Sequence, residues 1–101
     1  MRVEFSDLAK SDLRDITLQI AKRSTSRAFK YDDKIEARAK TIAILPHAGA
    51  PRPHWGKDIR IVVQDKYLIA HRARGKVVQI LRILHGARDL DALSAEESLP
   101  D

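Results

Sequence analysis

The chain of 101 residues contains no cysteine. Disulfide bonds and thiolate zinc sites are therefore excluded, and the hydrophobic core or a partner protein must hold the fold together. Aromatic residues are also few (one tryptophan, two tyrosines and two phenylalanines), while 44% of the residues are hydrophobic. This composition is typical of a soluble domain with a mainly aliphatic core. We expect one domain over residues 1–101, because this length supports one core and not two.

Long hydrophobic runs are absent as well. The first ten residues, MRVEFSDLAK, lack the apolar stretch of a signal peptide. No segment approaches the roughly 20 apolar residues that a membrane span requires. We therefore expect a cytoplasmic protein that does not contact a membrane.

Acidic residues are scarce in the second half of the chain. The net charge is +5; residues 52–88 contain nine lysines and arginines against two acids, whereas residues 89–101 contain five acids and no base. A basic half is typical of contact with nucleic acid, nucleoprotein or an acidic protein, although a merely soluble basic surface shows the same balance. We expect Arg72 and Arg74 to be ordinary solvated charges and residues 90–101 to form an acidic tail.

The first half predicts a strand and two helices. Residues 2–5 alternate as a short strand, and Ser6 offers an N-cap for a helix over residues 7–23. The hydroxyl residues 24–26 break this helix, and a second one follows until Pro46. Each helix has one apolar stripe: Ala9, Leu13, Ile16 and Ile20 on the first, and Ala28, Tyr31, Ile35, Ala39 and Ile42 on the second. So short a break folds the two helices into a hairpin.

The second half predicts a sheet. Residues 46–57 contain three of the four prolines and two of the four glycines, which indicates an irregular loop. Three strands follow over residues 59–63, 67–73 and 77–84, with tight connections typical of antiparallel hairpins. The predicted fold class is α+β: an N-terminal strand, a two-helix hairpin and a three-stranded antiparallel meander packed on the helices.

The last strand is apolar on both faces, yet it contains Arg82. Simple alternation puts Arg82 on the same face as Ile80 and Leu84. Because two helices cover only one face of a small sheet, we expect that face to be an uncovered apolar surface, which is typical of a binding site. The alternative is that Arg82 snorkels, or pairs with a nearby acid such as Asp89.

Three stretches, GAPRPHWGKDIR, KYLIAHR and VVQILRILHGARDL, resemble the RelE/ParE superfamily of bacterial toxins, and most closely its ParE branch. The resemblance covers roughly residues 3–90. It implies a toxin of a type II toxin–antitoxin system, neutralised in a hetero-oligomer when the C-terminal segment of a ParD-like antitoxin wraps it. Toxins similar to ParE act on DNA gyrase and block replication, so the resemblance also implies gyrase as the target.

Toxins similar to RelE instead cut messenger RNA on the ribosome, which requires acid–base groups and cations at the scissile phosphate. In those nucleases an arginine commonly follows the tyrosine of the middle strand, but here Leu68 follows Tyr67. We therefore expect a non-enzymatic gyrase inhibitor without catalytic residues or cofactor, which meets nucleic acid only through gyrase. The alternative is a RelE-type endoribonuclease that uses His85, Arg82, Arg88 and Arg60. A third possibility is a small nucleic-acid-binding or assembly module without toxicity.

The candidates for target contact are four basic residues and the tryptophan: Lys57, Arg60, Arg82, Arg88 and Trp55. Trp55 either anchors a partner or fastens its loop to the core, and the second is the commoner use of a lone tryptophan. Antitoxin contact is expected at apolar residues beside the helix stripes and on the last strand: Leu8, Leu18, Phe29, Ile80 and Leu84. The four histidines show no ligand spacing, so no metal site is expected.

Overall fold

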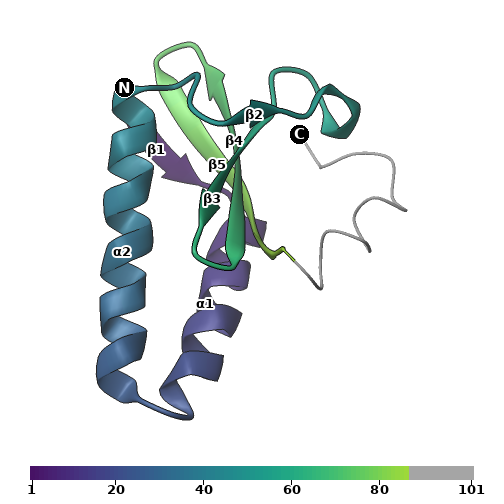
Figure 1. The fold of residues 1–101 in the computed structure, drawn as a ribbon. Coiled ribbons are helices and arrows are strands. Elements are labelled where there is room, and N and C mark those ends of the chain that lie inside the picture. The colour runs from purple at the N-terminus through teal and green to yellow at the C-terminus, as the bar shows by residue number, and fades with distance from the viewer. Residues whose placement is uncertain (87–101) are drawn as a thin grey trace.

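The computed structural model describes residues 1–86. Its elements are β1 (Arg2–Phe5), α1 (Asp7–Ala21), α2 (Thr25–Ile44), β2 (Ala50–Pro51), a 3₁₀ turn (Pro53–Trp55), β3 (Arg60–Gln64), β4 (Tyr67–Arg74) and β5 (Val77–His85), as drawn in Figure 1. The predicted α+β class and element order are confirmed. The short strand β2 was not predicted, because it lies inside the proline-rich loop.

All five strands form one sheet in the order β1-β5-β4-β3-β2. β1 pairs with β5 in parallel, while β5, β4, β3 and β2 form antiparallel neighbours. Parallel neighbours cannot be joined by a tight turn, and both helices lie in the chain between β1 and β5. The helical hairpin covers one face of the sheet and extends past the β3–β4 turn (Figure 1).

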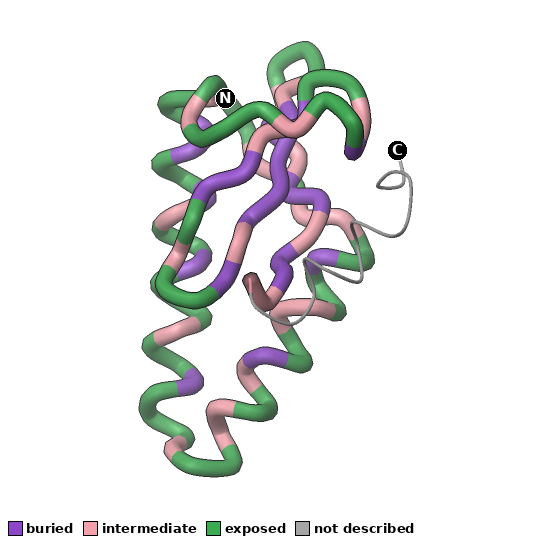
Figure 2. Tube along the Cα trace, turned by 45° about the vertical axis from the view of Figure 1, so that its right-hand side comes forward, coloured by how far each residue is buried: buried purple, intermediate pink, exposed green. Residues whose placement is uncertain are grey.

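The predicted helix stripes form the main core on this face. Ile35 and Ile42 of α2 are fully buried, and Ile16 of α1 is nearly so. They pack in one cluster with strand residues Val62, Tyr67, Ile69, Val78, Ile80 and Ile83. Figure 2 shows the same division, with buried positions along the strands and mostly exposed ones at the tip of the hairpin. The apolar periodicity of both helices is therefore confirmed.

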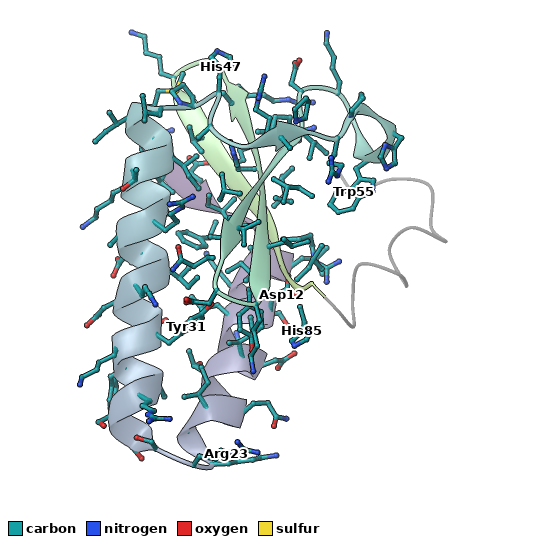
Figure 3. The ribbon with its side chains drawn as sticks, viewed as in Figure 1. Asp12, Arg23, Tyr31, His47, Trp55 and His85 are labelled. Carbon is teal, nitrogen blue, oxygen red and sulfur yellow. The ribbon has the colours of Figure 1, made fainter. Side chains whose placement is uncertain are left out.

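The loop between α2 and β3 covers the other face of the sheet. Its Trp55 packs in a second cluster of buried residues with Ile59, Ile61, Ala70, Leu81 and Leu84, and Figure 3 places Trp55 on the side of the sheet away from α2. The loop passes very close to β3 at Gly49, where an added Cβ would lie 2.1 Å from the Ile61 carbonyl oxygen and φ is +87°. Only glycine fits there. The expectation of an uncovered face is therefore wrong where the loop packs, around Leu81 and Leu84, whereas Val63 on the same face is 64% exposed.

A β-bulge in β5 explains the error. His71 pairs with Ile80 and Ala70 pairs with Arg82, so Leu81 has no partner across the ladder. An extra residue of this kind reverses the in–out alternation beyond it. Ile80 therefore packs in the helix-side core and Leu84 in the loop-side cluster, with exposures of 0% and 3%. Neither side chain lies on an accessible surface, contrary to their assignment as antitoxin-binding residues.

Candidate functional site

Arg82 forms a closed ion pair with Asp12 of α1. Arg82 Nε and Nη2 donate to Asp12 Oδ2 and Oδ1 at 2.8 and 3.0 Å, and the Ile83 N–H donates to Asp12 Oδ2 at 2.9 Å. Both side chains are largely buried, with 24% and 16% exposure. Arg82 therefore pairs with an acid, but the partner is Asp12, 70 positions away, and not the local acid that the sequence suggested; Asp89 lies outside the described residues.

This pair completes the edge of β5. β1 ends at Phe5, after which the Ser6 hydroxyl donates to the Leu81 carbonyl at 2.8 Å and also caps α1 by accepting the Ala9 N–H. Asp12, six residues after Ser6 on α1, then accepts the Ile83 N–H that a longer β1 would have bound. This explains why the apolar strand contains Arg82. Asp12 accepts the Ile83 N–H at the edge of the sheet, and Arg82 neutralises the Asp12 carboxylate.

The other target-contact candidates on the loop side differ in accessibility. Trp55 is 1% exposed and fastens the loop to the sheet, so the use as an exposed anchor is wrong. Lys57 is exposed in the same loop. Arg60, at the start of β3, is half-buried, and its Nη1 donates to the Gly49 carbonyl at 2.9 Å.

The candidate nuclease residues are not brought together within residues 1–86. Arg60 reaches toward Gly49, whereas Arg82 reaches toward α1. His85 pairs with Tyr67 across the β4–β5 ladder, and their rings meet edge-on with centroids 5.5 Å apart. Arg88, the fourth member, lies outside the described residues.

Two polar residues of β4 are buried, which sequence reasoning missed. Arg72 is 2% exposed and donates to the Gln79 side chain; the expectation that it is a solvated charge is wrong. His71 is fully buried, with Nε2 3.0 Å from the Ala48 carbonyl oxygen. Burial lowers the pKa of His71, so the imidazole is neutral near pH 7. The only signal was their position in the middle strand of the predicted sheet.

The three helical antitoxin candidates are accessible. Leu8, Leu18 and Phe29 are 44%, 57% and 68% exposed, as expected for positions beside the buried stripes. Large exposed apolar side chains on a helical hairpin are suited to contact with an amphipathic partner segment.

A groove lies where the tip half of the helical hairpin extends past the β3–β4 turn. It has a volume of about 520 Å³, and we call it the hairpin groove. Its lining residues come from both helices and the turn: Ile20, Arg27, Lys30, Tyr31, Lys34, Asp65, Lys66 and Tyr67. In Figure 3, Tyr31 projects from α2 into the space beside the sheet. The floor is apolar and aromatic, and the rim is basic.

The tyrosines and the turn are linked across the groove. The Tyr31 and Tyr67 ring centroids are 5.5 Å apart, and Lys34 Nζ donates to Asp65 at 2.9 Å. This hydrogen bond lowers the pKa of Asp65, whereas burial, with Asp65 and Tyr67 nearby, raises the pKa of Tyr31 above its ordinary range. The Tyr31 phenol thus stays protonated. Sequence reasoning missed this groove, because Tyr31 was assigned only to the helix stripe.

The comparisons with known proteins agree with this fold. The model for the ParE toxin of the type II toxin–antitoxin system parDE matches residues 3–90. The chain belongs to the ParE toxin family. A solved structure, the "Chromosomal ParDE TA system from P. aeruginosa", is similar with a TM-score of 0.71 and 25% identity, covering 84% of this chain and 95% of that chain. Among curated proteins, no sequence matches significantly.

The family assignment confirms the resemblance and the toxin class that it implied. Two further observations concern this ParE-family chain. Neither helix is long and apolar enough to cross a membrane. Within residues 1–86, no three histidine, aspartate or glutamate side chains gather closely enough to hold a metal ion.

Proposed function

We propose that this ParE-family toxin inhibits DNA gyrase in the cytoplasm and that a cognate ParD-like antitoxin neutralises it in a hetero-oligomeric complex. The family match over residues 3–90 is the observation that supports the proposal most strongly. The toxin acts by binding its target, without a catalytic step of its own and without a cofactor.

The apolar character of the loop-side sheet face supports a non-enzymatic toxin. Leu68 follows Tyr67 where the RelE-like nucleases commonly have an arginine, and Leu68 packs against the Trp55 cluster. Around Leu68 and Ala70 this face is filled by aliphatic side chains, and Arg72, which alternation puts on the same face, is 2% exposed and donates to Gln79, so the face presents few donors to a charged phosphorane.

The state of the acid–base candidates supports the same proposal. General acid–base catalysis needs groups within hydrogen-bond reach of one reacting centre. Arg60 and Arg82 point to different parts of the fold, and His85 packs on Tyr67. Each of these side chains makes a contact within the fold, and the three do not converge on one reacting centre.

The proposed antitoxin contact lies on the outer surface of the helical hairpin, at Leu8, Leu18 and Phe29. An amphipathic segment of the antitoxin would bury these side chains. Replacing Leu18 and Phe29 together by glutamate is expected to weaken antitoxin binding at least tenfold in a titration with the purified partner. Because both are exposed, the thermal unfolding midpoint should change little.

The deciding experiment adds purified toxin to DNA gyrase and plasmid DNA. We expect supercoiling to stop and gyrase-linked cleaved DNA to accumulate, and the antitoxin to prevent both. Lys57→Glu reverses an exposed charge three residues before Arg60 and should weaken the inhibition, whereas Lys40→Glu, an exposed reversal on α2, should leave it unchanged.

Controlled expression tests the alternative. Labelled thymidine and labelled amino acid are followed in parallel after induction, and an early fall in DNA synthesis is expected. If protein synthesis falls first, with cut messenger RNA, and His85→Ala abolishes the effect, the gyrase proposal is wrong and the RelE-type endoribonuclease replaces it.

A further inference from the structure

The hairpin groove is not used by any contact proposed so far. We propose that it binds single-stranded nucleic acid, with the phosphates along the basic rim on α2 and a base against Tyr31. This goes beyond the expectation that the toxin meets nucleic acid only through gyrase.

The basic wall of the groove is a regular row. Arg27, Lys30 and Lys34 follow one another at i, i+3 and i+7, so they share one face of α2. At 1.5 Å per residue, the row spans roughly 10 Å along the helix. Lys66 stands on the β3–β4 turn, at the opposite rim. Arg27 and Lys30 are spaced to contact neighbouring phosphates of one strand, and Lys66 can contact a third phosphate from the opposite rim.

The charge balance at the groove is strongly positive. Asp65 is the one acid among its lining residues, and Lys34 pairs with it at 2.9 Å. Arg27, Lys30 and Lys66 have no acidic partner within residues 1–86. Three cations therefore remain for an anionic ligand, and Asp65 is already neutralised.

The floor offers an aromatic surface to a base. Tyr31 is half-buried and Tyr67 is 7% exposed, so Tyr31 is the ring that a ligand meets first. Its position is fixed by Tyr67, whose ring centroid is 5.5 Å away, and by Ile20 beside it. A positively charged groove with an aromatic platform is the arrangement that proteins use for single strands without sequence preference.

The geometry favours an unpaired strand over two other anions. A duplex hides its bases from a concave apolar floor, so it would use the rim alone. The carboxylates of an acidic peptide would also meet the rim cations, but a carboxylate has no ring to stack on Tyr31, whereas every nucleotide has one. The groove has a volume of about 520 Å³ and is open to solvent, so it can hold one base with its sugar while the strand continues along the rim.

The test uses the full-length toxin and fluorescein-labelled dT₁₀ and rU₁₀, with anisotropy measured at 50 mM salt. We expect similar binding of both oligonucleotides, since the rim contacts phosphates. Between 50 and 200 mM salt, three phosphate contacts should weaken binding roughly 20-fold. Tyr31→Leu should weaken it about tenfold through lost stacking.

A matched pair of variants separates the groove from general charge. Arg27→Glu with Lys30→Glu reverses two rim cations, and Lys10→Glu with Lys40→Glu reverses two exposed cations that do not line the groove. The net charge changes equally in both. The rim variant should lose at least tenfold in affinity and most of the salt dependence, and the control at most about twofold. Unfolding midpoints, and binding of the antitoxin, check that each variant is folded.

Three results would overturn the inference. They are no binding of either oligonucleotide at 50 mM salt, equal weakening by the two double variants, or groove-dependent binding of a glutamate-rich decapeptide in place of the oligonucleotides. The assay contains no gyrase, so it succeeds or fails independently of the proposed function.

Discussion

The two faces of the sheet are closed in different ways. Two complete helices cover one face, and their stripes pack with Ile69, Ile80 and Ile83 in the main core. A single loop covers the other, and its largest buried side chain is Trp55. Because a loop relaxes more easily than a helix pair, equal deletions on the two faces should cost different free energies. The comparison also shows that apolar residues on both faces of a strand do not by themselves indicate a free surface.

The largest effect is expected in the helix-side core. Ile80→Ala should lower the free energy of unfolding by about 4 kcal/mol, because the helices cannot collapse into the cavity, and Leu84→Ala on the loop side by about 2 kcal/mol. Both residues are nearly inaccessible, at 0% and 3% exposure. Urea unfolding of the two variants measures the difference. Equal losses would mean that the loop is as rigid a cover as the helices.

Removal of the tryptophan comes next. Trp55→Ala should cost about 3 kcal/mol, at the low end for a buried aromatic, since the loop relaxes. Trp55→Phe should cost about 1 kcal/mol, because Trp55 Nε1 is buried without a hydrogen-bond partner among the described residues, and phenylalanine removes this donor. Thermal and urea unfolding report both values. If Trp55→Phe costs as much as Trp55→Ala, the indole nitrogen has a partner in solution.

A smaller loss in the free energy of unfolding is expected from Asp12, which lies at the edge of β5. Asp12→Ala removes the ion pair with Arg82 and the acceptor of the Ile83 N–H, and should cost about 2 kcal/mol. Asp12→Asn keeps an acceptor but loses the charge, so about 1 kcal/mol is expected.

A double-mutant cycle with Arg82→Ala isolates the pair itself. Additive losses would show that Arg82 and Asp12 contribute separately, and the edge closure would then rest on the Ile83 bond alone. Gyrase inhibition by Arg82→Ala, measured at a temperature where the variant is folded, shows whether Arg82 also contacts the target.

The elements were predictable because their signals are local. The stripe that includes Ile35 and Ile42, the Ser6 cap and the tight turns each depend on a few neighbouring residues, and all are confirmed. The face of Ile80 and Leu84 was mispredicted because one bulge, at Leu81, is a property of the ladder and not of the strand's own pattern.

The sites depended on contacts between distant residues. The partner of Arg82 is 70 positions away, and the hairpin groove joins α2 to a turn that no periodicity connects with it. Trp55 was correctly preferred as a fastening for its loop, since a lone tryptophan is too large to leave exposed at little cost. No local sequence pattern indicated that this loop packs over the sheet face opposite the helices.

The smallest effect concerns the pH dependence of stability and comes from His71. His71 is buried beneath the Ala48 carbonyl, and its pKa is lowered by burial and by the nearby cations Arg60 and Arg38, with His47 also close. The native state therefore resists protonation, whereas the unfolded chain takes up a proton below about pH 6.5. Stability contributed by neutral His71 is fully present above that pH and is lost progressively as the pH falls from there to the lowered pKa of the native state. Urea midpoints at pH 7.5 and 5.5 should differ for the natural chain and differ less for His71→Gln, which keeps a donor for Ala48. An unchanged pH dependence in that variant would assign the effect to another group.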